Sequence, residues 1–284
     1  MTRAALLVFA FSTSAALADV PRVVTDIPPV HSLAASVMGD LGKPKLLLWQ
    51  GADAHDYQMR PSDAQALANA DAVFWIGPEM TPWLDRALQV DNPGRAIALL
   101  AAPGTQAMAF AEGGTDPHAF LDPGNATLWL VLIADHLAAL DPANAAAYRA
   151  NAEAEAAHIA AADAEIAARL GPVAHRPIIV FHEAFGYFAA HFGLTVAGSV
   201  SLGDAADPGA ARLSSIREQL SDVACIFPES GHDPKQTALL AEGTPARIGR
   251  PLDPEGRDLQ PGPDLYTTLL TNLGVAITDC LAAP

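Results

Sequence analysis

Residues 177–183, Pro-Ile-Ile-Val-Phe-His-Glu, place an uninterrupted apolar run directly before His182 and Glu183. A continuous apolar run of this length is typical of a β-strand buried on both faces, as in parallel sheets covered by helices. Ligands bind at the carboxyl ends of the strands in such sheets. We therefore expect a strand at 178–181 that presents His182 at a binding edge.

Seven other short apolar runs alternate with helical patterns along the chain. The expected strands are 22–25, 45–49, 72–76 and 96–100 in the first half, and 178–181, 195–199, 223–227 and 246–249 in the second. Strands that alternate with helices predict parallel sheets covered on both faces. Two sets of four predict an α/β fold with two lobes, each a roughly four-stranded parallel sheet flanked by helices.

A long helical pattern without a strand separates the two sets. Asp122 is suited to cap it, with Pro123 at the first helical position. The pattern pauses after Leu140, and the alanine-rich second piece has the acidic side chains of a long, partly solvated helix. We expect this second piece to join the lobes rigidly. The expected division is an N-terminal lobe at 19–141, an interlobe helix at 142–170 and a C-terminal lobe at 171–284.

The first 18 residues have the pattern of a secretory signal peptide. Arg3 precedes an apolar core at 4–11, and small residues at 16–18 predict cleavage near Ala18 and Asp19. No later run reaches the roughly 20 apolar residues that span a bilayer, so we expect an exported protein without membrane insertion. Its formal charge is −16, or −17 once Arg3 is removed, which argues against nucleic acid or anionic lipid as a partner.

Cys225 and Cys280 are the two cysteines of the chain. In an exported protein such a pair is expected to form a disulfide. Closing this loop would stabilise the fold by roughly 4 kcal/mol in the chain-entropy model. Cys225 lies in the apolar pattern 223–227, which disfavours a cysteine metal site.

Three histidines lie in separate loops, each just beyond an expected strand or just before an expected helix. They are His55, His118 and His182, and their spacing matches no short metal signature. Their joint placement predicts one metal site gathered from distant loops. The helix after His55 is expected to begin near Pro61, with a capping box formed by Ser62 and Gln65.

A carboxylate is the expected fourth ligand. Asp253, after the strand at 246–249, is the first choice, and Glu229, after the strand at 223–227, is the runner-up. Three nitrogens and one carboxylate suit tetrahedral Zn²⁺, whereas a set richer in oxygen would favour manganese. The chain has no nucleophile turn, phosphate-cradling loop, dinucleotide fingerprint or His-Glu-x-x-His helix.

Four segments of the chain resemble one family of exported proteins. They are His-Asp-Tyr-Gln-Met-Arg-Pro-Ser-Asp at 55–63, Ala-Asp-Ala-Val-Phe-Trp-Ile-Gly-Pro-Glu-Met at 70–80, Phe-His-Glu-Ala-Phe-Gly-Tyr-Phe at 181–188, and Leu-Asp-Pro-Glu-Gly at 252–256. They resemble the periplasmic zinc-binding proteins of ZnuA-type ABC importers. The likeness covers nearly the whole chain after the signal.

The resemblance implies two α/β lobes joined by a rigid helix, with the metal in the cleft between them. It carries ligand roles onto His55, His118 and His182, and a histidine rather than a glutamate at the third position favours zinc. Asp253 matches the position of an acidic fourth ligand in many relatives. The two cysteines match a disulfide of close zinc-binding relatives.

Two departures from the family pattern affect the metal site. Some zinc-binding members have an acidic residue directly before the first histidine, where this chain has Ala54. Asp253 or water would therefore complete the shell. Many members also carry a histidine-rich loop before the second ligand, whereas residues 91–116 contain no histidine.

The resemblance predicts a monomeric, non-enzymatic protein that captures Zn²⁺ in the periplasm and delivers it to an inner-membrane ABC permease. Three alternatives differ in the role of the metal. The first is a manganese-binding member of the same family. The second is an exported zinc-dependent hydrolase, with Glu183 as general base. The third is an exported adhesin or sensor with a structural metal.

Overall fold

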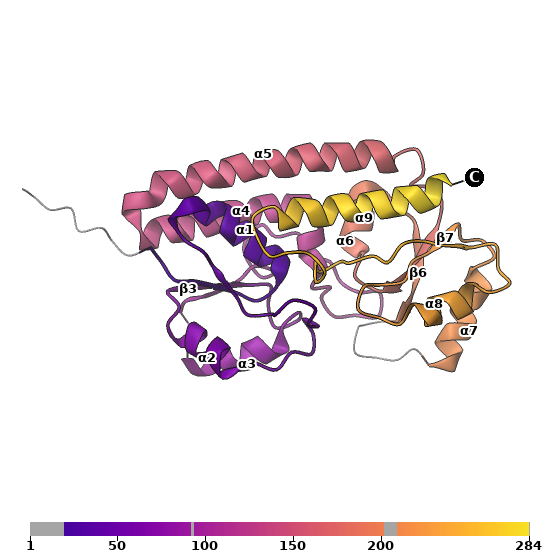
Figure 1. Cartoon of the computed structure of the whole chain (residues 1–284), viewed down its shortest axis with the longest axis horizontal. Coiled ribbons are helices and arrows are strands. Elements are labelled where there is room, and N and C mark those ends of the chain that lie inside the picture. Colours follow the sequence, from indigo (N-terminus) through magenta and orange to yellow (C-terminus); the bar gives the residue numbers. More distant parts are fainter. Residues whose placement is uncertain (1–19, 92–93, 202–208, 284) are drawn as a thin grey trace, which may run out of the picture.

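Two parallel sheets lie side by side beneath a layer of long helices in the computed structural model of the chain (Figure 1). The structure describes residues 20–91, 94–201 and 209–283. The signal peptide expected at 1–18, with its cleavage point near Ala18 and Asp19, lies outside the described residues.

Each sheet has four parallel strands, and the two sheets share one topology. The first has the order β2-β1-β3-β4 and the second the order β6-β5-β7-β8. The strands are β1 (Val23–Thr25), β2 (Lys45–Leu46), β3 (Ala72–Trp75), β4 (Ala96–Ala98), β5 (Ile178–His182), β6 (Val196–Ser201), β7 (Cys225–Ile226) and β8 (Arg247–Ile248). All eight expected strands are confirmed, and so is the fold class of two four-stranded α/β lobes.

Helices cover both sheets. The α-helices are α1 (Pro28–Met38), α2 (Pro61–Ala68), α3 (Pro82–Asp91), α4 (Pro123–Leu140), α5 (Ala145–Leu170), α6 (Gly186–Phe192), α7 (Ala210–Gln219), α8 (Pro234–Ala241) and α9 (Leu265–Ala282). The short 3₁₀ helices are η1 (Gly39–Leu41), η2 (His118–Leu121) and η3 (Pro142–Asn144). In Figure 1, α2 and α3 lie below the first sheet and α7 and α8 lie at the outer side of the second.

The start of α4 has the cap that the sequence predicts, whereas that of α2 differs. The Asp122 carboxylate accepts a hydrogen bond from the backbone N–H of Gly124 at 2.8 Å. In α2, Asp63 accepts from the backbone N–H of Arg60 at 3.0 Å. The capping box expected from Ser62 and Gln65 is therefore wrong. Pro61 occupies the first helical position, which makes Asp63 the third helical residue and places it within reach of the cap.

Helix α5 extends along both lobes, and α9 begins near α1 and runs beside α5 over the second lobe (Figure 1). Helix α9 packs closely on α5 at Gly274. A Cβ atom added to this glycine would lie only 2.9 Å from Cγ2 of Ile166 in α5, so the approach depends on the absence of a side chain at this position. The disulfide between Cys225 and Cys280 is confirmed and ties β7 to α9. Within the described residues, α9 is the one helix long and apolar enough to cross a membrane, but half of it is buried. We therefore interpret α9 as a core helix.

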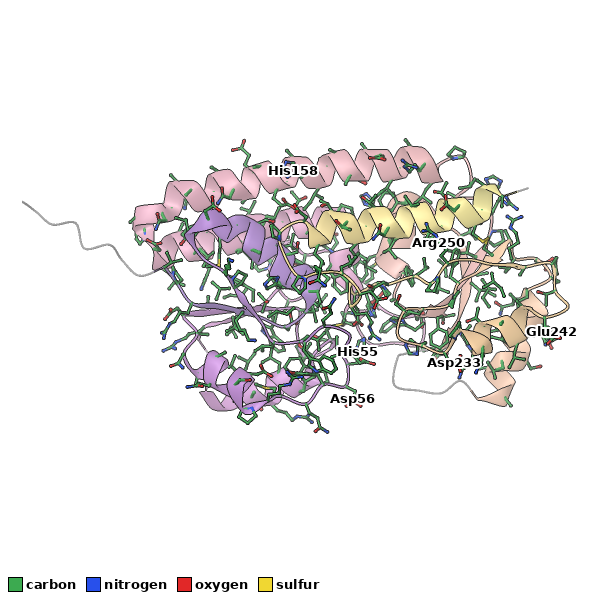
Figure 2. All side chains as sticks on the ribbon, viewed as in Figure 1. His55, Asp56, His158, Asp233, Glu242 and Arg250 are labelled. Atoms are coloured by element: carbon green, nitrogen blue, oxygen red, sulfur yellow. A yellow bond between two sulfur atoms is a disulfide. The ribbon has the colours of Figure 1, made fainter. Side chains whose placement is uncertain are left out.

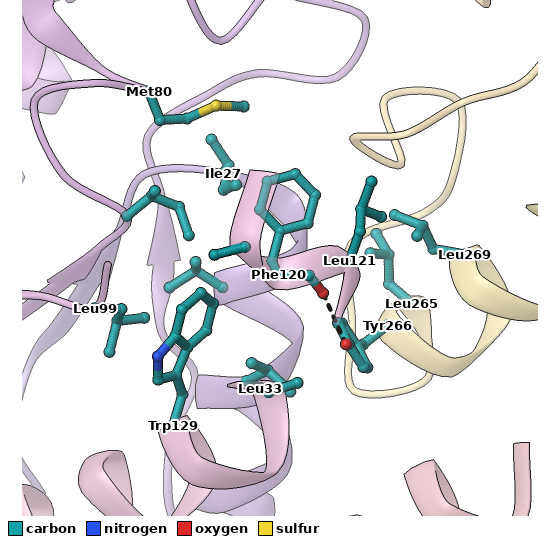
Figure 3. Packing of buried hydrophobic residues seen from close by; sticks show 14 of the residues in the cluster. Ile27, Leu33, Met80, Leu99, Phe120, Leu121, Trp129, Leu265, Tyr266 and Leu269 are labelled. Carbon is teal, nitrogen blue, oxygen red and sulfur yellow. Dashed lines mark hydrogen bonds between the residues drawn. The ribbon is translucent and has the colours of Figure 1, made fainter. Parts of the chain in front are cut away.

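One hydrophobic core continues through both lobes. It contains side chains of β1 and β3 from the first lobe, of α4, α5 and α9, and of β5 from the second. Figure 3 shows Phe120 and Leu121 of η2 between Trp129 on one side and Leu265 and Leu269 of α9 on the other. The core therefore anchors the short helix that begins with His118.

Candidate metal centre

His182 is the last residue of β5 and is almost completely buried. Its Nδ1 atom makes a short hydrogen bond with Oε2 of Glu229, which is also buried. Glu229 follows β7, the strand next to β5, so the sheet topology brings the two side chains together. The carboxylate orients the ring and leaves Nε2 for a metal.

His118 begins η2 and is buried as well. The carboxylate of Asp116 lies 2.8 Å from its Nδ1 atom and also accepts its backbone N–H at 2.9 Å. Since Asp116 acts on His118 as Glu229 acts on His182, both rings have the carboxylate–histidine arrangement of metal sites. Sequence reasoning missed this role of Asp116. Its position two residues before a loop histidine, in Asp-Pro-His, was the available signal.

His55 lies in the irregular loop between β2 and α2, where its side chain is 21% exposed. Two hydrogen bonds hold the backbone of the loop next to His55. Trp83 of α3 donates from Nε1 to the carbonyl oxygen of Ala54 at 2.8 Å, and Asp53 accepts from the backbone N–H of His55 at 2.8 Å. Figure 2 places His55 where the two lobes meet. The side chain of His55 is the most exposed of the three histidines, since those of His118 and His182 are 3% and 1% exposed.

The structure brings the three histidines together at one point. One potential ligand atom from each lies within 4.8 Å of those of the other two. The Nε2 atoms of His118 and His182 are 3.3 Å apart. Two nitrogens bound to one tetrahedral zinc at about 2.05 Å lie about 3.3 Å from each other, so this spacing fits the ion.

The hydrogen bonds also set the chemistry of these two nitrogens. A neutral imidazole carries one N–H, and its other nitrogen is an acceptor. Because Nδ1 of His118 and of His182 faces a carboxylate, each neutral ring is held with Nδ1 protonated and a lone pair on Nε2. When both rings are neutral, the two lone pairs face each other across 3.3 Å and repel, and a cation between them removes that repulsion. The pair is suited to bind a metal ion.

The two carboxylates expected as fourth ligand have other contacts in this structure. Glu229 holds His182 from behind, on the ring nitrogen opposite Nε2. Asp253 accepts backbone N–H groups with both oxygens, from Arg257 at 3.0 Å and from Asp258 at 2.9 Å. Burial raises the pKa of Asp253 above the usual aspartate value.

A third carboxylate, Glu255, lies beside His55. Its Oε1 atom is 3.9 Å from Nε2 of His55, and its side chain is 1% exposed. The buried guanidinium of Arg257 lies 3.4 Å from its other oxygen. Sequence reasoning missed Glu255, because the loop around it has no regular pattern that would predict its direction.

Glu183, the base nominated for a hydrolase, lines a cavity of about 380 Å³ together with Ser199 and Arg212. Burial raises its pKa, and the nearby negative charge of Asp116 raises it further. Among the described residues that line this cavity, none is one of the three histidines. Asp116 and His118 are nevertheless near enough for their charges to act on the Glu183 carboxylate.

Relatives of known name match almost the whole chain. The family described as zinc-uptake complex component A, periplasmic (ZnuA) matches residues 23–280. The high-affinity zinc uptake system protein ZnuA of Paracoccus denitrificans is 44% identical, over 98% of both chains. The protein of the same name from Brucella suis is 34% identical, over 92% of this chain and 91% of the relative.

Solved structures agree with these sequence matches. A crystal structure of ZnuA superposes with a TM-score of 0.77 at 26% identity and covers 91% of this chain and 99% of that one. A zinc-bound ZnuA deletion mutant has a TM-score of 0.80 at 25% identity, with 94% and 100% coverage. From its fold and from matches that extend over nearly its full length, the chain belongs to the ZnuA family of periplasmic zinc-uptake components.

Proposed function

We propose that this protein captures Zn²⁺ between its lobes in the periplasm and delivers it to an inner-membrane ABC permease. The observation that carries the proposal is the convergence of His55, His118 and His182, with Nε2 atoms of the two buried rings 3.3 Å apart. The zinc-uptake names of full-length relatives support the same cargo. In this proposal the protein is a binding protein rather than an enzyme.

The donor set favours zinc over manganese. Three imidazole nitrogens suit Zn²⁺, whereas Mn²⁺ is favoured by sites richer in oxygen. Asp116 and Glu229 bind the ring nitrogens opposite Nε2, so as placed they support the histidines instead of adding oxygen to the site. A carboxylate completes the shell, and from the sequence we expect Asp253, with Glu229 as the alternative.

The periplasmic location rests on the family description and on the signal peptide expected at 1–18. A protein released there carries its ion by diffusion to a permease in the inner membrane. A monomer suffices for this role, because all three histidines come from one chain.

Isothermal titration with Zn²⁺ at neutral pH tests the proposal. We expect one tight site per chain in the wild type and loss of that site in the variant with His55, His118 and His182 all changed to alanine. His158→Ala is the matched control, because this exposed residue lies on α5 away from His55 (Figure 2). Tight stoichiometric binding by the triple variant would refute the site.

The same proteins titrated with Mn²⁺ test the choice of ion, and a strain without the chromosomal gene tests transport. Weaker binding of Mn²⁺ than of Zn²⁺ is expected. Restored growth under zinc limitation by the wild type, but not by the triple variant, is the expected result in cells. An adhesin or sensor would leave zinc uptake unchanged.

A further inference from the structure

Four acidic side chains lie close to the histidines or on the loop beside them, and the contacts of two assign them a supporting role. Asp116 and Glu229 each contact the Nδ1 atom of a histidine whose Nε2 atom faces the other ring. A carboxylate in that position fixes ring orientation and raises the basicity of the ligand nitrogen. As placed, these two carboxylates act through the histidines.

Asp253 stabilises the loop of residues 253–258 through hydrogen bonds to its backbone. Its two oxygens accept the backbone N–H groups of Arg257 and Asp258, which closes the turn that contains Glu255. Asp253 also lines a cavity of about 450 Å³ with Asn272 and Leu273 of α9. These contacts direct Asp253 toward its own loop and toward α9.

Glu255 lies next to His55, whereas Asp116 and Glu229 contact the other two histidines. Its Oε1 atom lies 3.9 Å from Nε2 of His55, and Nε2 is the nitrogen that faces the centre on both His118 and His182. Ligand atoms of a tetrahedral zinc site are about 3.3 Å apart. A shift of well under one ångström along this line would bring Glu255 and His55 to the separation of two ligands.

Formal charge around the centre favours a cation there. When ionised, the buried carboxylates Asp116, Glu229 and Glu255 contribute three negative charges, and the buried Arg257 contributes one positive charge. Their sum is −2, and Asp253, which accepts backbone N–H groups of its own loop, is outside this sum. Buried charges are stable only when they are paired or coordinate a metal, so Arg257 offsets part of the carboxylate charge while the ion is away.

We propose that Glu255 is the oxygen ligand that completes the site, and that Asp253 positions the loop that carries Glu255 and Arg257. This inference rests on the proposed function. It assigns the fourth position to a residue outside the pair expected from the sequence, and it places that ligand next to His55, at the exposed side of the centre.

The test compares Glu255→Gln with Asp253→Asn and Glu229→Gln, three substitutions that remove charge and nearly preserve shape. Competition titration with a zinc chelator measures affinity. The visible absorption of bound Co²⁺ reports the ligand set, because its bands depend on coordination number and ligand type. Thermal unfolding without metal verifies that each variant is folded.

We expect Glu255→Gln to weaken zinc binding by about 100-fold and to change the Co²⁺ spectrum. Glu229→Gln and Asp253→Asn should weaken binding by about 10-fold, as supporting groups around metal sites do, and leave the spectrum unchanged. If Glu255→Gln does not fold, Glu255→Asp keeps the charge and shortens the reach, and we expect it to lose affinity as well.

Two outcomes would overturn the assignment. One is a Glu255 variant with the wild-type Co²⁺ spectrum, which would leave Glu255 at most an orienting role. The other is a spectral change in Asp253→Asn alone, which would make Asp253 the ligand. Failure of the wild type to bind zinc would instead refute the proposed function. If the wild type binds zinc and the triple histidine variant does not, the proposed function stands, and an unchanged Co²⁺ spectrum in Glu255→Gln then refutes this inference alone.

Discussion

The three histidines differ in how firmly the protein holds them. His118 and His182 are buried, and each has its Nδ1 atom against a carboxylate. His55 is partly exposed, and the hydrogen bonds of Asp53 and Trp83 hold the backbone beside it rather than its ring, from which Oε1 of Glu255 is 3.9 Å away. The two buried rings therefore form a fixed pair, and we infer that His55 closes the site when an ion arrives from the exposed side.

Asp116 gives a direct test of this fixed pair. Asp116→Ala removes the acceptor at Nδ1 and the cap on the backbone N–H of His118. Loss of such an orienting carboxylate costs about 10- to 100-fold in metal affinity, and we expect that loss for zinc by competition titration. Asp116→Asn keeps an acceptor oxygen and should fall between the alanine variant and the wild type. An unchanged dissociation constant in Asp116→Ala would contradict the orienting role.

The buried carboxyl group of Asp26 should make the free energy of unfolding depend on pH, independently of zinc binding. Its carboxylate, at the end of β1, accepts the backbone N–H groups of Ile27 and Ile76, but burial outweighs these bonds and raises its pKa from 3.8 to about 6. The native state therefore binds the proton more tightly than the unfolded state. The associated stability is present below pH 4 and is lost as the pH rises through 6.

The measurement is urea unfolding of metal-free wild type and Asp26→Asn between pH 4 and 7. At about 1.4 kcal/mol per pKa unit, the free energy of unfolding of the wild type should fall relative to the variant by roughly 2.4 kcal/mol between pH 4 and 7. Because the other groups titrate in both proteins, the difference between them isolates Asp26. A constant difference would show that the carboxylate has an ordinary pKa.

At the scale of elements, η2 links the metal centre to the core. It begins with His118, and its other residues, Ala119, Phe120 and Leu121, are fully buried. The hydroxyl of Tyr266 in α9 donates to the carbonyl oxygen of Phe120 at 2.7 Å, as the dashed line in Figure 3 marks. The position of His118, one of the proposed metal ligands, therefore depends on a helix that follows it by more than 140 residues.

Tyr266→Phe tests this link. The variant leaves a buried carbonyl oxygen without its donor, which costs about 1–3 kcal/mol. We also expect zinc affinity to fall several-fold, because η2 loses a restraint next to His118. Chemical unfolding and zinc titration measure the two effects.

Tyr148→Phe is the matched control for Tyr266→Phe. Tyr148 is also completely buried, and its hydroxyl donates to Asp141 at 3.0 Å at the start of α5. This variant should lose stability without losing zinc affinity. Equal effects of both substitutions on zinc binding would show that η2 is not held specifically by Tyr266.

Elements that depend on local patterns were predictable, and contacts that depend on the tertiary fold were not. All eight strands follow from short apolar runs, and Asp122 was identified as a cap from its place before Pro123. The three histidines stood out because each lies next to an expected element. Glu255 reaches His55 only through the packing of the two lobes, and neither sequence segment carries a sign of that contact.

At the scale of the whole molecule, the helices α4, α5 and α9 form a spine that connects the two lobes. The continuous core passes through α4, α5 and α9 and includes β-strands of both lobes. Helix α9 makes a second connection beside α5, and its first turn is tied to α1, because Ser32 accepts the backbone N–H of Tyr266 at 3.0 Å. Such a spine resists wide opening of the lobes, so we expect zinc release to involve the loop of His55 rather than rotation of one lobe.

The disulfide fastens this spine to the second sheet, and its removal separates global stability from metal binding. Cys225 and Cys280 are 55 residues apart in the sequence. In the chain-entropy model, changing both to alanine should lower the free energy of unfolding by about 4 kcal/mol. His55, His118 and His182 lie outside the loop that this bond closes, and Glu255 lies inside it. Neither cysteine is a proposed ligand, so zinc affinity should stay unchanged wherever the variant is folded.

Zinc should offset that loss, because an ion that binds only the native state stabilises it by about 4 kcal/mol at a free concentration 1,000 times the dissociation constant. We therefore expect the double alanine variant with zinc at that concentration to match the stability of the metal-free wild type in urea unfolding. The wild type under reducing conditions is the control for effects of the substitutions themselves. A folded variant that had lost zinc binding would contradict the prediction, and it would show that the bond between β7 and α9 also positions Glu229 and His182.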